Sequence, residues 1–278
     1  MIVLPFLGAA SFGISTLLEK IVLKDRKVNL ESFVVAVFLS SVLIMIPLVF
    51  FLGKIGEGAF SFLNIFLFVL VIGFSIIANL LGFYAIRWEK LTHLEPVRLL
   101  EPLFVVILAF IFFKSERDLR VIIPAFIAGL TLVLSHVKKH HLDLNKYILA
   151  GIASGFFYAL ELLISNHLLL FYSPIALYFI RGLGVLVFLS LLFKPSLKSA
   201  FTKNEKIMVF LTGGLWVAYR VITYYGYLKW GMIFTTLILM LAPLFVYLLA
   251  WKFLKEKLEF RNILATIIIL CCVIYVVI

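Results

Sequence analysis

Residues 100–120 read LEPLFVVILAFIFFKSERDLR, and residues 241–261 read LAPLFVYLLAWKFLKEKLEFR. Aligned at an offset of 141, the two stretches share ten identical residues, more than a common apolar composition normally gives. A weaker match at nearly the same offset joins the beginnings of the two halves. The chain is therefore predicted to contain two copies of one unit, residues 1–140 and residues 141–278.

The composition excludes a water-soluble fold. Hydrophobic residues make up 64% of the 278 residues and charged residues only 14%, against about a quarter charged in ordinary soluble domains. A helix needs about 20 residues to cross a bilayer, and charged or turn-forming clusters divide the chain into segments of that length. The predicted fold class is an all-α, polytopic membrane protein with ten transmembrane helices, at residues 2–23, 32–53, 62–86, 91–113, 119–137, 147–170, 173–193, 206–229, 231–254 and 260–278.

Each copy holds five predicted helices, and five is an odd number. The second copy must therefore enter the membrane in the opposite orientation to the first. Inverted repeats of this kind are typical of secondary transporters, because two related halves around one site can exchange conformations and so alternate access. The sequence thus predicts two inverted five-helix repeats.

The net charge of +11 is best explained by membrane topology. Most of the 25 Lys and Arg residues lie in loops that would share one side of the membrane, among them Lys20, Lys24, Lys252 and Arg261. Loops rich in Lys and Arg normally face the cytoplasm, so both termini are predicted on the extracytoplasmic side of the cell membrane. This distribution gives no reason to expect a nucleic-acid partner.

Sequence motifs for catalysis or metal binding are missing. The chain has no Walker loop, no HExxH motif and no GxSxG motif. Its two cysteines, Cys271 and Cys272, are adjacent within the last predicted helix. Ten helices and their short connections also leave no room for a separate catalytic domain. We expect no catalytic residue, no metal site and no cofactor, and therefore no enzyme.

Charged residues inside the spans are costly unless they are paired or face water, so each is a candidate for function. Glu95, Arg98 and Glu101 follow one another at intervals of three residues in the fourth predicted helix, which places them on one stripe of its surface. Either the three pair among themselves to hold helices together, or Arg98 and Glu101 face a cavity and bind a charged solute or a proton. Their counterparts at the offset of 141 carry no charge: Thr236, Leu239 and Ala242.

Three further charges lie deep in the second half: Glu161, Arg181 and Arg220. Arginine cannot neutralise itself, so each needs a carboxylate, carbonyl groups or an anionic ligand. Glu161 and Arg220 could pair with each other. Alternatively, Glu161 could bind a solute amine or a proton while Arg220 binds a carboxylate. Nearby polar and aromatic side chains are candidates for the walls of the site: Asn79, Tyr158, Trp216 and Tyr219.

Two weak motifs recur at equivalent places in the halves. Pro102 and Pro243 lie in the first parts of helices 4 and 9, which they are expected to kink at a cavity. The acidic residues Glu116 and Glu256 follow these helices. Together with the five-plus-five arrangement, they resemble the drug/metabolite transporter superfamily in its ten-helix EamA-like branch, over essentially the whole chain. The resemblance implies a central cavity lined mainly by helices 1, 3, 4, 6, 8 and 9, with helices 5 and 10 as scaffold. It also implies that helix 7 is peripheral, so Arg181 on this helix is expected to be structural.

These features predict a secondary active or facilitative transporter that moves a small polar metabolite by alternating access. Carboxylates and guanidinium groups are balanced in the spans, which favours an amino-acid-like zwitterion. One alternative is a carrier of cationic or quaternary ammonium compounds, with Glu161 and the aromatic residues as a cage. Another is a membrane-embedded, lipid-handling protein. The expected partners are the lipid bilayer and the solute; coupling to protons or to a counter-solute is left open.

Overall fold

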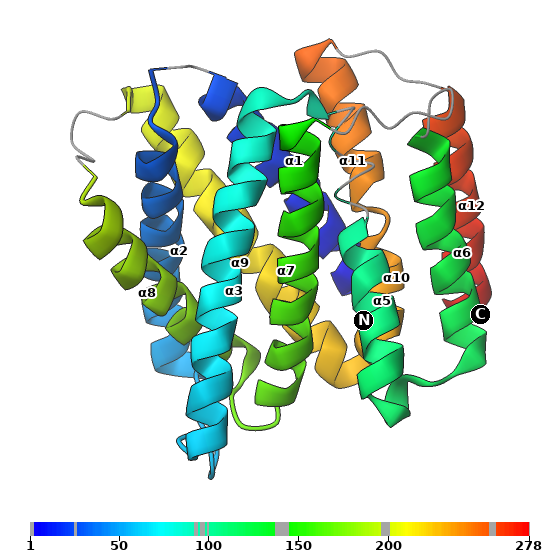
Figure 1. Cartoon of the computed structure of the whole chain (residues 1–278), viewed down its shortest axis with the longest axis horizontal. Helices are drawn as coiled ribbons and strands as arrows, with labels where there is room; N and C mark the ends of the chain where they lie inside the picture. Colours follow the sequence, from blue (N-terminus) through cyan, green and yellow to red (C-terminus); the bar gives the residue numbers. More distant parts are fainter. Residues whose placement is uncertain are drawn as a thin grey trace.

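The computed structural model describes residues 3–24, 27–91, 94, 98, 100–136, 145–195, 201–255 and 260–277. Each of the ten predicted spans contains a helix (Figure 1). The helices are α1 (Val3–Lys24), α2 (Leu30–Leu52), α3 (Phe62–Trp88), α5 (Leu100–Phe112), α6 (Leu119–His136), α7 (Lys146–Leu168), α8 (Pro174–Phe193), α9 (Lys203–Trp230), α10 (Met232–Leu239), α11 (Ala242–Leu249) and α12 (Phe260–Val277), with a 3₁₀ turn at Lys114–Glu116 and a π-helical turn at Ala250–Leu254.

The helices pack with the symmetry that an inverted repeat requires. Successive spans run alternately up and down in Figure 1, so α7, the first helix of the second half, runs opposite to α1. The helix α1 packs on α9 and α11, and its counterpart α7 packs on α3 and α5 in the same way. The pairs α2 with α8 and α6 with α12 each join equivalent helices and lie at opposite ends of the molecule. The predicted arrangement of ten helices in two repeats is confirmed; the proposed boundary after residue 140 lies outside the described residues.

The surface of the bundle suits lipid, and its largely apolar interior also holds charged groups. Large apolar side chains point outward, as Phe50 and Phe62 do with exposed fractions of 81% and 88%. Wholly buried groups instead include Glu19, Glu161 and Arg220. Among the described residues, seven helices are long and apolar enough to cross a membrane, and three shorter apolar helices lie at Leu100–Phe112, Leu119–Thr131 and Ile267–Val276.

Two of the predicted helix bounds need correction. The ninth span was expected as one helix, but it breaks at Met240 and Leu241. The proline two residues later causes the break, because Pro243 has no N–H to donate to the carbonyl of Leu239 and its ring would clash there. The eighth span begins at Lys203, three residues early, because Thr202 and Glu205 form a reciprocal capping box.

The loop after α5 holds the beginning of α10 in the other half. Both oxygens of Glu116 accept hydrogen bonds, from the backbone N–H groups of Met232 (2.7 Å) and Ile233 (3.0 Å). Gly231 precedes them at φ +89°, and a β-carbon there would come within 3.1 Å of the Glu116 carboxylate. A carboxylate at this position satisfies the unpaired N–H groups and the positive end of the helix dipole.

We expect Glu116→Ala to loosen this attachment. Losing a cap of this kind costs about 0.5–2 kcal/mol, so the melting temperature of the purified protein falls by a few degrees. Hydrogen exchange at the Met232 and Ile233 amides should accelerate. Glu57→Ala, which removes an exposed carboxylate, serves as the control. Unchanged exchange at both amides would show that Glu116 does not hold α10.

Candidate functional site

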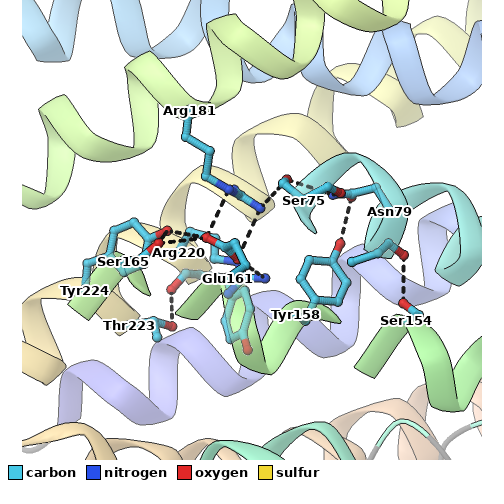
Figure 2. A network of polar contacts seen from close by, with 12 residues as sticks. Ser75, Asn79, Ser154, Tyr158, Glu161, Ser165, Arg181, Arg220, Thr223 and Tyr224 are labelled. Carbon is cyan, nitrogen blue, oxygen red and sulfur yellow. Dashed lines mark hydrogen bonds and ion pairs between the residues drawn. The ribbon is translucent and has the colours of Figure 1, made fainter. Parts of the chain in front are cut away.

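A cluster of three buried charges joins α7, α8 and α9 (Figure 2). The carboxylate of Glu161 on α7 is wholly buried and lies 3.1 Å from Nε of Arg181 on α8 and 3.5 Å from Nη2 of Arg220 on α9. The pairing of Glu161 with Arg220, one of the two alternatives, is confirmed. Arg181 is also a structural partner, although its side chain is only 2% exposed and so lies in the core.

Two hydroxyl groups also donate hydrogen bonds to the Glu161 carboxylate. The hydroxyl groups of Tyr224 and Ser165 donate to its Oε1 at 2.9 and 3.0 Å. Two charged and two neutral donors therefore surround one carboxylate, which is what a buried charge needs to be tolerated. In this conformation Glu161 acts as the counter-ion of two arginines, and a solute amine would have to displace them.

A chain of hydrogen bonds leads from this cluster toward two small cavities, which are described below. Arg181 donates to Oγ of Ser75 on α3 at 2.7 Å, and the Asn79 amide donates to the Ser75 carbonyl at 2.7 Å. The Tyr158 hydroxyl donates to Oδ1 of Asn79, again at 2.7 Å. The ion cluster thus fixes the orientation of Asn79 and Tyr158 on α3 and α7 (Figure 2).

The aromatic residues enclose a cation that belongs to the protein itself. The guanidinium carbon of Arg220 lies 4.9, 5.8 and 5.6 Å from the ring centres of Tyr158, Trp216 and Tyr219. These are cation–π distances. The cage that a quaternary ammonium solute would require is therefore occupied by Arg220. Two of its donors, Nε and Nη1, have no hydrogen-bond acceptor among the described residues.

Two cavities are lined by helices of both halves. Cavity A lies among α1, α3, α5, α7 and α9, and about 20 Å³ of it is open to the centre of a water molecule. Cavity B lies among α1, α5, α7, α9, α10 and α11, with about 40 Å³ open in the same way. Each has room for one or a few waters. Pro102 and Pro243 both line cavity B, as expected of kinks placed at the site.

Arg98 and Glu101 line both cavities and so form the wall that they share. Arg98 is held against α1, where its Nη1 donates to Oγ1 of Thr16 at 3.2 Å and its guanidinium lies 4.6 Å from the ring centre of Phe12. The uncharged residues at the equivalent positions of the second half line cavity B as well: Thr236, Leu239 and Ala242. The two repeats thus meet at cavity B, where the residues from the first repeat are charged and the equivalent residues from the second are not.

The other candidate residues divide into two groups. Asn79, Tyr158 and Trp216 line cavity A, and Tyr219 lines cavity B. Glu161 and Arg220 line neither of these cavities in this conformation. The remaining candidate, Glu95, lies outside the described residues.

One residue of the site was not anticipated. Glu19, near the end of α1, was not among the candidate residues, but it is wholly buried and lines cavity A. The indole N–H of Trp216 donates to its Oε1. A signal was present in the spacing, because Phe12, Thr16 and Glu19 share one face of a helix and the resemblance already assigned helix 1 to the cavity.

Comparison with known proteins agrees with this architecture. The model of the EamA-like transporter family matches residues 1–137 and 145–278. The chain belongs to this family. This EamA-like protein is therefore a multi-pass membrane protein of a transporter family that lies within the drug/metabolite transporter superfamily.

A solved crystal structure supports the fold of this EamA-like protein. It is 16% identical in sequence and has a TM-score of 0.73, and the match covers 98% of this chain and 95% of the other. At that identity the likeness supports the fold alone. No curated protein matches the sequence significantly.

Proposed function

We propose that this protein transports a small zwitterionic metabolite, with an amino acid as the leading class, and that the solute binds at the wall between cavities A and B. The observation that carries this proposal is the position of Arg98 and Glu101, which present one cation and one anion to both cavities. A guanidinium group binds a carboxylate through paired hydrogen bonds, and a carboxylate binds an ammonium group. A zwitterion carries a group that complements each of these two charges.

The remaining candidate residues have supporting roles in this proposal. Tyr158, Trp216 and Tyr219 form the walls beside the solute, and Asn79 offers it an amide. The Glu161–Arg220 pair keeps the aromatic side chains in place beneath the solute. Glu161 and Arg220 come into contact with the solute only if the pair opens.

The small size of the cavities is consistent with alternating access. Each holds only a few waters, so a solute requires the halves to move apart on one side at a time. Pro102 and Pro243 interrupt equivalent spans beside cavity B and supply points at which the helices can bend.

Transport into proteoliposomes tests the proposal. Losing a charge-assisted hydrogen bond costs about 1.5–3 kcal/mol, so Arg98→Gln and Glu101→Gln should weaken apparent affinity about 10- to 100-fold. Glu57→Gln, at an exposed carboxylate, is the matched control. Folded variants at both sites that transport at the wild-type rate would refute the proposed site.

Competition in the same vesicles distinguishes the classes of solute. We expect unlabelled amino acids to inhibit uptake and choline to be ineffective, because Arg220 already fills the aromatic cage. Inhibition by choline alone would favour a carrier of quaternary ammonium compounds. Chemical conversion of lipid by the purified protein would favour a lipid-handling protein. An imposed pH gradient that drives uptake would identify protons as the coupling ion.

We also propose that both termini lie on the extracytoplasmic side of the cell membrane, in keeping with the distribution of Lys and Arg. Single cysteines introduced at Lys54 and Lys194, in a background without Cys271 and Cys272, should react with an impermeant reagent from opposite sides. Labelling of the Lys194 position from outside intact cells would reverse the orientation.

A further inference from the structure

The residue that the sequence did not single out, Glu19, has the chemistry of a second site for the solute's ammonium group. It is 0% exposed and lies on α1 within a membrane span. A carboxylate so placed is expensive to keep, and such residues mark solute or ion pathways by default. The neighbouring Lys20 connects this end of α1 to the end of α3, because its ammonium donates to the backbone carbonyls of Ile86 (2.8 Å) and Glu89.

The position of Glu19 differs from that of Glu101 in one respect. Glu101 lines cavities A and B, whereas Glu19 lines cavity A and is not among the residues that line cavity B. Arg98 connects the two sites, because it also lines both cavities and bonds to Thr16, which lies one turn before Glu19 on α1. One guanidinium group is thus accompanied by two carboxylates, of which one lines both cavities and the other lines cavity A.

The surroundings of Glu19 suit a cation. The indole N–H of Trp216 donates to its Oε1 and so holds the carboxylate beside the aromatic ring. That ring is stacked on Tyr158 with the ring centres 6.5 Å apart, and both residues line cavity A. Arg220 already lies against the rings of Trp216 and Tyr158, so the charge of the Glu19 carboxylate is what attracts an ammonium group.

We propose that Glu19 and Trp216 form a binding site for an ammonium group that is used only while cavity A is open. The solute's carboxylate stays on Arg98, and its ammonium group moves from Glu101 to Glu19 as the solute passes from cavity B to cavity A. This inference rests on the proposed function and adds to it the path that the solute's ammonium group follows.

Side-specific kinetics test the inference. In proteoliposomes of known orientation, the half-saturating concentration of a zwitterionic amino acid is measured separately from each face of the membrane. Glu19→Gln should raise it about 10-fold on the face to which cavity A opens and leave the other face within about twofold. Glu101→Gln should raise it on both faces, and Glu19→Asp should recover part of the loss.

Three outcomes separate this inference from the function on which it rests. If the wild-type protein moves no zwitterion, the proposed function fails. If it does move one, and Glu19→Gln changes both faces equally, Glu19 is not specific to cavity A. If Glu19→Gln is folded and changes neither face, Glu19 is not a solute site. Thermal unfolding of each variant confirms that it is folded before transport is compared.

Discussion

Replacing Glu161 with leucine is expected to be among the most damaging single substitutions in this protein. The change removes the carboxylate that lies 3.1 Å from Arg181 and 3.5 Å from Arg220, both of which are almost wholly buried. Breaking a buried ion pair by removing one partner costs about 3–5 kcal/mol, because it leaves uncompensated charge in a poorly solvating interior. Thermal unfolding in detergent should show a large loss of stability and a low yield of folded protein.

Replacing Arg181 and Arg220 as well should reverse most of this loss of stability. Buried ion clusters can often be replaced by well-packed apolar residues at little cost, so the triple variant Glu161→Leu, Arg181→Leu and Arg220→Leu is expected to melt closer to the wild-type protein. Glu57→Leu, at an exposed position, controls for the added apolar side chain. If Glu161→Leu alone melts like the wild-type protein, the three charges are not coupled as the structure indicates.

Most of the architecture could be predicted because it depends on the length and the number of the apolar segments. Apolar segments of membrane-spanning length, the identities between residues 100–120 and 241–261, and an odd number of helices in each copy together determine an inverted repeat. The break at Met240 was harder to predict. Pro243 was recognised as a point of bending, but a proline can bend a helix or end it, and the surrounding packing decides which.

The site was predicted less completely, for a physical reason. The sequence shows which charges lie inside the membrane, but it does not show which helices bring their partners near. The pairing of Glu161 with Arg220 was therefore only one of two alternatives. Arg181 was expected at the periphery, although it contacts the same carboxylate. Glu19 was missed because the basic residues after it, Lys20 and Lys24, made that end of the helix resemble an ordinary membrane interface.

The second prediction concerns the close approach of helices across the two halves. Gly13 on α1 faces α11, and a β-carbon added there would lie 2.6 Å from Cβ of Phe245 and 3.2 Å from the backbone nitrogen of Val246. Backbone atoms cannot move aside as a flexible side chain can, so Gly13→Ala should force the two helices apart. Overpacking of this kind costs about 1–3 kcal/mol, and Gly13→Val should cost more.

Two other glycines supply a graded comparison for this prediction. At Gly155 on α7 a β-carbon would lie 3.2 Å from Cβ of Glu101, while a β-carbon at Gly73 on α3 would meet no atom within 4 Å. Melting temperatures should therefore fall most for Gly13→Ala, less for Gly155→Ala, and not at all for Gly73→Ala, where alanine favours the helix by about 1 kcal/mol. Because Gly155 touches Glu101, its alanine variant should also lose transport while remaining folded. A Gly13→Ala protein that melts as high as Gly73→Ala would show that α1 and α11 can separate freely, and the rigid contact between the halves would have to be abandoned.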